Sequence, residues 1–292
     1  MMKILCLFLW SAFICAAPVK VVTTLPVLKS ITEEIGGKLV SVQSLAEPTQ
    51  DAHFVQPKPT FMKKVRHAQL FIEVGMDLEL WAQKVVDSAG NPKVQQAQAG
   101  RVMASAGVEP LEVPAVLSRE YGDIHPYGNP HIWLDPVRVK KMAENIALAL
   151  GNIDPKHEES YEKNLKAFKE KIDKELVVWE KKAKAIKDKQ ILTYHRSWSY
   201  FAKRFGFDVV GYVEVKPGIP PTPRHRDAII KLVKREKVKT ILMELFYDPT
   251  APDYIAKKTG AKVVQVPIDV GAVPEAKDYF SLITYILDKL AS

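Results

Sequence analysis

Three histidines and one aspartate stand at positions where open α/β folds bind ligands. His53 follows a predicted strand and precedes a proline-opened helix, and His131 comes directly before another helix. His195 ends one predicted strand, and Asp269 follows another. Imidazole nitrogens and carboxylate oxygens are ligands for transition-metal ions such as Zn²⁺. These residue types therefore favour a metal site, provided that the fold brings four distant residues together.

Each of these four signals is weak when it is taken alone. The four residues are far apart in the sequence and match no local metal motif such as His-Glu-x-x-His. A single histidine in a loop is more often a surface or capping residue, and Asp269 is equally suited to turning the chain before Gly271. The pattern therefore leaves two interpretations open: unrelated surface residues, or a metal site that only the tertiary structure assembles.

The elements that must position these residues alternate between short β-branched runs and amphipathic segments. We predict strands at 21–25, 41–46, 70–74, 191–194, 209–215, 240–245 and 263–267. We predict helices at 28–36, 60–68, 78–89, 136–150, 198–205, 224–236, 254–259 and 278–290. Such alternation indicates an α/β fold with two lobes, each a mostly parallel sheet flanked by helices. The candidate ligands are divided equally between the lobes, so a cleft between lobes would bring them together.

One long helix is predicted to join the lobes. The larger apolar residues between 155 and 188 recur in steps of three and four, which is typical of a single helical stripe. They are Tyr161, Leu165, Phe168, Ile172, Leu176, Trp179, Ala183 and Ile186. At 1.5 Å per residue this helix would be on the order of 50 Å long. We interpret it as a spine across both lobes, with a coiled-coil dimer as the alternative.

These observations divide the chain into four parts. We expect a signal peptide at 1–17, an N-terminal lobe at 18–154, the spine helix at 155–189 and a C-terminal lobe at 190–292. The first part has Lys3 followed by a mostly apolar run that ends in small residues, as secretory signal peptides do. That run is shorter than the roughly 20 residues of a membrane-spanning helix. A buried N-terminal helix or strand is the alternative interpretation.

The cysteines support export. The only two in the chain, Cys6 and Cys15, both lie in the expected signal peptide, so a chain cleaved after Cys15 has no cysteine. Any metal site in the mature chain must then use nitrogen and oxygen ligands. We expect a soluble protein that is periplasmic or otherwise extracytoplasmic, with lipid attachment at Cys15 as the alternative.

The net charge does not indicate a nucleic-acid partner. The 292 residues include 42 Lys and Arg against 34 Asp and Glu, a formal charge of +8. In the predicted spine the two signs are interleaved, as on an exposed helix face. The sequence has no aromatic-interleaved basic motif and no zinc-finger spacing. With 47% hydrophobic and 26% charged residues, the chain is also neither disordered nor a multi-span membrane protein.

Six motifs, in the same order along the chain, give a family resemblance. The chain resembles the metal-binding solute receptors of bacterial ABC importers for zinc and manganese, the zinc-receptor and TroA-like group. The resemblance covers essentially the whole mature chain, and its most specific motif is Asn-Pro-His-Ile-Trp-Leu-Asp-Pro at 129–136. The other motifs are at 22–27, 51–53, 74–81, 193–201 and 243–244.

The resemblance implies a function and a ligand set. It places His53, His131, His195 and Asp269 at the four metal-ligand positions. Many zinc receptors of this group have histidine at the third position, where typical manganese receptors have glutamate. The resemblance therefore implies a monomeric, non-catalytic receptor that captures Zn²⁺ between its lobes and delivers it to an ABC permease. The alternatives are a manganese or ferrous-iron receptor of the same group, a secreted zinc hydrolase, or a metal-binding adhesin.

Some residues depart from the family pattern. Many zinc receptors have a histidine-rich loop before the second ligand, but here the stretch 120–128 holds only Asp123 and His125. We expect a plain surface loop there, with a transient metal contact by His125 as the alternative. Ala52 replaces the usual proline beside the first ligand. Arg196 would either face the metal and weaken binding or pair with a carboxylate, and the sequence does not decide between these.

Two further acidic residues have structural interpretations. Asp135 lies four residues after His131, but Pro136 behind it indicates that it caps a helix. Glu244 lies near the end of a predicted strand and is a candidate hydrogen-bond partner for a ligand imidazole. Trp133 is expected to pack behind the site.

Overall fold

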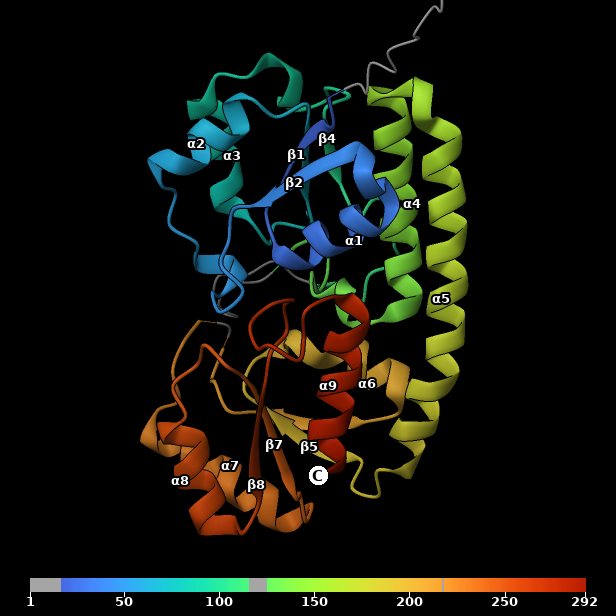
Figure 1. The fold of residues 1–292 in the computed structure, drawn as a ribbon. Coiled ribbons are helices and arrows are strands. Elements are labelled where there is room, and N and C mark those ends of the chain that lie inside the picture. The colour runs from blue at the N-terminus through green and yellow to red at the C-terminus, as the bar shows by residue number, and fades with distance from the viewer. Residues whose placement is uncertain (1–16, 116–124, 217) are drawn as a thin grey trace, which may run out of the picture.

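The structure, a computed structural model, describes residues 17–115, 125–216 and 218–292 and contains two four-stranded parallel sheets (Figure 1). The strands of the first sheet are β1 (Val19–Thr23), β2 (Val40–Ser44), β3 (Leu70–Glu73) and β4 (Arg101–Met103), in the order β2-β1-β3-β4. Those of the second are β5 (Gln190–Thr193), β6 (Asp208–Tyr212), β7 (Thr240–Glu244) and β8 (Lys262–Val266), in the equivalent order β6-β5-β7-β8. The predicted α/β class with two parallel sheets is confirmed.

Helices cover the sheets, as the short apolar strands require. They are α1 (Pro26–Gly36), α2 (Pro59–Arg66), α3 (Leu80–Ala89), α4 (Pro136–Ile153), α5 (Glu158–Ala185), α6 (Ser199–Phe205), α7 (Pro223–Arg235), α8 (Thr250–Thr259) and α9 (Tyr279–Ala291). Helix α8 begins four residues before the predicted start because Asp248 accepts hydrogen bonds from the backbone and side chain of Thr250. Strand β4 was not predicted, since it has three residues, none of them buried, and no alternating pattern.

Helix α5 is the predicted spine. Its 28 residues are about 42 Å long at 1.5 Å per residue. It packs against α1 and α4 on the N-terminal side and against α6 and α9 on the C-terminal side (Figure 1). The Asn164 amide donates to the carbonyl of Ile35, and the Trp179 indole donates to the Thr284 hydroxyl. Because the apolar stripe is buried within the chain, it is not free to form the coiled coil considered as an alternative.

The two halves, before and after α5, are also bonded directly to each other. The indole nitrogen of Trp133 donates to the carbonyl of Ile268 over 2.7 Å, and the hydroxyl of Tyr279 donates to the carbonyl of Trp133 over 3.0 Å. The Tyr200 hydroxyl donates to the carbonyl of Asn129 and accepts from the backbone of Leu111. All these contacts gather around the segment that precedes α4, so this segment has a fixed place between the halves.

Asp135 adds an ionic contact at the same junction. Its carboxylate is almost fully buried, caps α4 through the backbone N–H of Val137, and pairs with Arg138 of α4 and Arg204 of α6. The predicted capping role is therefore confirmed. In addition, this one carboxylate neutralises two guanidinium groups from opposite halves of the molecule.

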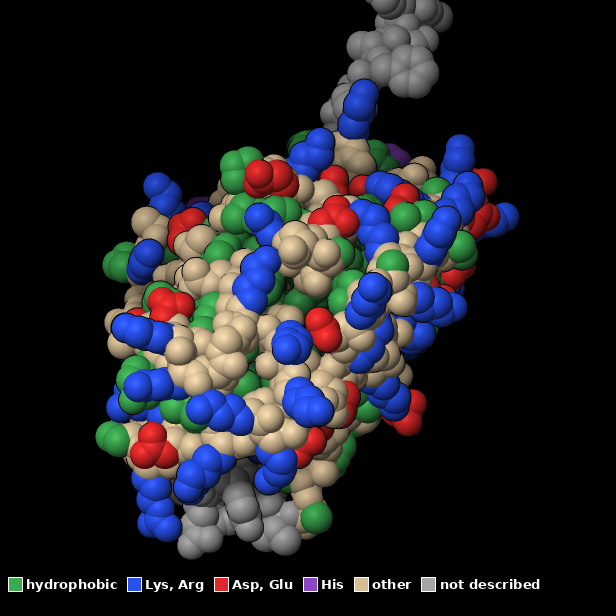
Figure 2. Space-filling view, turned by 90° about the horizontal axis from the view of Figure 1, so that it is seen from below, with side chains coloured by type: hydrophobic (Ala, Val, Ile, Leu, Met, Phe, Trp, Pro, Cys, Tyr) green, Lys and Arg blue, Asp and Glu red, His purple; other side chains and the backbone are tan. Residues whose placement is uncertain are grey.

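The surface bears the mixed charge expected from the composition. Seen from the end formed by the C-terminal half, Lys and Arg side chains are spread over the surface with Asp and Glu among them (Figure 2). Within the residues that the structure describes, no helix has the length and apolar character needed to cross a membrane. Apart from Ala17, the expected signal peptide with Cys6 and Cys15 lies outside those residues, and so does Asp123.

We predict that Asp135→Asn destabilises the protein by about 3 kcal/mol, because two partly buried guanidinium groups then lack their counter-charge. The matched control is Asp173→Asn, which removes an exposed ion pair with Lys140 and should cost less than about 1 kcal/mol. The measurement is urea unfolding of both metal-free variants at neutral pH. Equal effects of the two substitutions would show that the Asp135 contacts do not stabilise the junction.

Candidate metal centre

His53, His131 and His195 converge from three separate parts of the chain. Each offers a ring nitrogen, and the three nitrogens all lie within 4.8 Å of one another. The ring centroids are 5.2 Å apart for His53 and His131, and 5.4 Å apart for His195 and each of the other two. His131 and His195 are buried, and His53 is half-buried. Three imidazoles in this arrangement form a ready set of nitrogen ligands for a metal ion.

The sheets account for this convergence. His53 lies in the connection that leaves the carboxyl end of β2, and His195 follows β5 by two residues. In both sheets the strand order reverses beside the first strand, β1 or β5, and such switch points are where open α/β sheets bind ligands. His131 is brought to the same place by the segment that precedes α4, through the hydrogen bonds of Trp133 and Tyr279.

Two of the histidines are oriented by the residue two positions before them. The Oδ1 atom of Asp51 accepts from the backbone N–H of His53 and lies 2.7 Å from its Nδ1. The Oδ1 atom of Asn129 likewise accepts from the backbone N–H of His131 and lies 3.0 Å from its Nδ1. Since these oxygens only accept, each Nδ1 carries the proton and each Nε2 keeps a lone pair for a metal.

His195 is oriented by a distant residue instead. Its Nδ1 lies 2.5 Å from Oε1 of Glu214, which follows β6 and is buried. The sequence suggested Glu244 for such a role, but both Glu244 carboxylate oxygens lack a hydrogen-bond partner among the described residues. Burial raises the pKa of Glu244 to about 7. Glu214 was missed because its contact depends on how β6 pairs with β5, for which the sequence has no local signal.

The three histidines differ in their affinity for protons. Burial, together with the neighbouring His53 and His195, holds the pKa of His131 well below its usual range. Burial alone would lower the pKa of His195 as well, but the hydrogen bond and charge of Glu214 outweigh burial and raise it. His131 is therefore neutral at pH 7, whereas His195 retains a proton more readily than a free histidine.

His125 lies closer to the centre than the sequence suggested. Its Nε2 is 3.1 Å from Nε2 of His53, and burial followed by the charge of His53 lowers its pKa to about 4. The expectation of a plain surface loop is wrong for this residue, because its ring contacts a candidate ligand. With Nδ1 of His53 protonated, the hydrogen bond between the two rings runs from His125 to the lone pair of His53.

Asp269 is buried and lies outside the group of three histidines. Its Oδ1 atom accepts from the backbone N–H groups of Val27, at 2.6 Å, and Val270, at 2.7 Å. Its neighbour Ile268 is bonded to Trp133, whose ring centroid is 5.3 Å from that of His131. Burial raises the pKa of Asp269 to about 8, and among the described residues no cation pairs with it.

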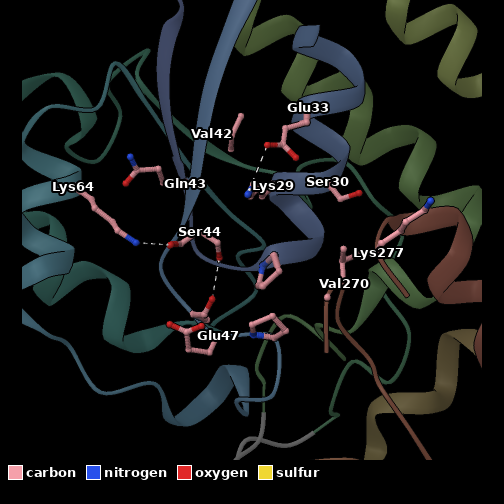
Figure 3. A pocket seen from close by; sticks show the side chains of 14 residues that line it. Lys29, Ser30, Glu33, Val42, Gln43, Ser44, Glu47, Lys64, Val270 and Lys277 are labelled. Atoms are coloured by element: carbon pink, nitrogen blue, oxygen red, sulfur yellow. Dashed lines mark hydrogen bonds and ion pairs between the residues drawn. The ribbon is translucent and has the colours of Figure 1, made fainter. Parts of the chain in front are cut away.

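The segment beside Asp269 also borders a pocket of about 480 Å³ (Figure 3). This pocket is lined by α1, β2, the connection after β2, Lys64 of α2, and the stretch from Val270 to Lys277. Lys64 donates to the carbonyl of Ser44, and Lys29 pairs with Glu33. Since no histidine lines it, the pocket is separate from the group of three histidines.

Arg196, left undecided by the sequence, stacks on an aromatic ring. Its guanidinium carbon lies 4.5 Å from the centre of the Tyr212 ring. Among the described residues it forms no ion pair with a carboxylate. Trp133 packs against His131, as expected. The residues around the three histidines therefore give them hydrogen-bond acceptors and aromatic neighbours.

The chain is similar to proteins that bind several different metals. Residues 21–292 match the family described as zinc-uptake complex component A, periplasmic. The iron-binding protein YfeA of Yersinia pestis is 30% identical over 280 residues, which cover 93% of this chain and 85% of YfeA. The manganese ABC transporter substrate-binding lipoprotein PsaA of Streptococcus pneumoniae serotype 4 is 28% identical over 281 residues, covering 93% of this chain and 88% of PsaA.

The fold agrees with these similarities. A crystal structure of ZnuA has a TM-score of 0.80 to this structure at 24% identity, and the match covers 94% of this chain and 98% of that chain. The resemblance inferred from the six sequence motifs is thus confirmed. The chain belongs to the family of periplasmic zinc-uptake components, whose members are metal-binding substrate receptors of ABC importers and are not enzymes.

Proposed function

We propose that this receptor captures Zn²⁺ with His53, His131, His195 and Asp269 and delivers it to its ABC permease. The observation that carries the proposal is the convergence of three imidazoles whose Nδ1 atoms are all occupied by acceptors. This leaves the three Nε2 atoms as the ligand atoms, with Nε2 of His53 exchanging its hydrogen bond from His125 for the metal. Asp269 supplies the negative charge, since a buried carboxyl group without a cationic partner favours binding of a cation nearby.

The donor set favours zinc over the metals named for the relatives. Three imidazole nitrogens and one carboxylate oxygen suit the four-coordinate tetrahedral geometry of Zn²⁺. Manganese prefers more oxygen ligands, and affinities of nitrogen sites generally rise from Mn²⁺ through Fe²⁺ to Zn²⁺. Four protein ligands also fill the coordination shell, whereas a catalytic zinc keeps one position open. A transport site is therefore a better fit than a hydrolase site.

The location and release of the metal complete the proposal. We propose that residues 1–17 direct the chain out of the cytoplasm and that the mature receptor acts as a monomer. The bonds between the halves and the continuous helix α5 oppose a wide hinge opening. Release of the metal then depends on small shifts of ligands and loops.

We expect the metal-free mature protein to bind one Zn²⁺, with a preference over Mn²⁺ of at least about 100-fold. His195→Ala and Asp269→Ala should each weaken zinc binding by more than about 100-fold, because each removes a ligand. The measurement is a competition titration against a chromophoric chelator. His67→Ala is the matched control, since His67 is exposed on the surface and should leave the affinity unchanged.

Two outcomes would contradict this proposal in different ways. Tight manganese binding without a zinc preference would exclude zinc as the preferred metal while retaining the site. Unchanged affinity in both His195→Ala and Asp269→Ala would instead exclude the site.

We also predict that zinc binding releases protons and weakens as the pH falls. Metal must displace the proton of Asp269, whose pKa is about 8, and that of His195, whose pKa is raised. Well above pH 8 Asp269 is already deprotonated, so its contribution to the pH dependence of the affinity ends there. Below the pKa of each group, its displaced proton costs about tenfold in affinity per pH unit. His131, with its low pKa, contributes nothing near neutral pH.

Calorimetry in two buffers of different ionisation enthalpy counts these protons. We expect between about one and two protons per zinc at pH 7. Glu214→Gln should reduce that number, because the charge that keeps His195 protonated is lost. Binding without any proton release at pH 7 would refute the assigned protonation states.

A further inference from the structure

The side chain of Tyr247 links the two halves of the molecule at the metal centre. Tyr247 lies in the turn that follows β7, in the C-terminal half, and its hydroxyl is 3.1 Å from Oδ2 of Asp51, in the N-terminal half. A phenol is the donor and a carboxylate the acceptor in such a pair. This hydrogen bond therefore crosses from one half to the other.

Asp51 is already engaged with a candidate ligand through its other oxygen. Oδ1 accepts from the backbone N–H of His53 and from its ring Nδ1. The two oxygens belong to one rigid planar group, so the bond to Tyr247 at Oδ2 restricts the rotation of the carboxylate. The direction in which His53 presents Nε2 is consequently tied to the position of Tyr247.

Tyr247 is itself held against the strand that carries another candidate ligand. Its ring stacks on that of Tyr194 with centroids 4.3 Å apart and an interplanar angle of 15°. Tyr194 directly precedes His195, and the centroid of the Tyr247 ring is 6.1 Å from that of His195. One side chain thus packs beside His195 with its ring and controls the partner of His53 with its hydroxyl.

The side chain of Asn129 likewise contacts both a histidine and the other half of the molecule. Its Oδ1 atom holds His131, while its Nδ2 atom donates to the carbonyl of Arg196 in the C-terminal half over 2.7 Å. Both residues that orient a histidine of the N-terminal half therefore have their second polar atom bonded to the other half. The orientation of two ligands depends on contact between the halves.

We infer that Tyr247 is a positioning residue that couples the contact between the halves to the orientation of His53. With the halves together, the Tyr247 hydroxyl fixes Asp51 and so directs Nε2 of His53 at the metal. When the turn that carries Tyr247 shifts away from Asp51, this hydrogen bond is lost, His53 gains rotational freedom, and the metal dissociates faster. The inference rests on the proposed function, because it requires His53 to bind the metal.

The test compares two phenylalanine substitutions in one aromatic stack. Tyr247→Phe keeps the ring and removes only the hydroxyl, and we expect zinc affinity to fall about three- to tenfold, as for the loss of one hydrogen bond, with faster dissociation. Tyr194→Phe is the matched control: within the described residues its hydroxyl forms no hydrogen bond, so affinity should stay unchanged. Zinc affinity, the stopped-flow dissociation rate and thermal unfolding of the metal-free proteins are measured for each.

A double-mutant cycle distinguishes coupling through Asp51 from a general loss of structure. In an Asp51→Ala background, Tyr247→Phe should have no further effect on zinc affinity, because the group that it positions is gone. Full additivity of the two substitutions would overturn the inference. Equal weakening of zinc binding by Tyr247→Phe and Tyr194→Phe would also overturn it, because the effect would then come from stacking. Wild-type zinc affinity and dissociation rate of Tyr247→Phe would overturn it as well. Failure of the wild-type protein to bind any metal would instead refute the proposed function.

Discussion

Three imidazole rings within 5.4 Å of one another can share a largely buried space only if their protons point away from it. Here each Nδ1 proton has an acceptor of its own, provided by Asp51, Asn129 and Glu214. The Nε2 atoms are then left as possible ligands for a cation, once His53 gives up its hydrogen bond from His125 and His195 loses its proton. The position of the acceptors, more than that of the histidines alone, makes the space suitable for a metal ion.

The two halves meet this requirement by different means. In the N-terminal half the acceptor is two residues before the histidine, so a single tight turn determines the positions of the acceptor and of the histidine ring. In the C-terminal half Glu214 reaches His195 only because β6 lies beside β5, where the pairing shifts between Ile191 and Leu192. The first arrangement is local and survives wherever that turn forms. The second requires a folded sheet, so His195 is oriented only after the C-terminal half has folded.

The sequence predicted what depends on periodicity and missed what depends on strand register. The alternating elements, the buried stripe of α5 and the cap at Asp135 all follow from local patterns, and the structure contains them. The acceptors Asp51 and Asn129 do have a local signal in the sequence, a polar residue two positions before each histidine. Glu214 could not be chosen over Glu244, because both follow or end strands next to β5.

The unpartnered Glu244 shows that strand register determines which acidic residue contacts His195. Strands β6 and β7 both pair with β5, so the acidic residues near their carboxyl ends compete for the one Nδ1 of His195. Glu214 obtains it, and its other oxygen accepts from the backbone of Gly218. Glu244 remains buried without a donor among the described residues, and burial raises its pKa to about 7, so it is only partly charged near neutral pH. A second fully charged carboxylate beside His195 would hold the histidine proton more tightly and oppose the metal. His195 therefore has one charged acceptor, Glu214, at its Nδ1 atom, and the second buried carboxyl group nearby has no hydrogen-bond donor among the described residues.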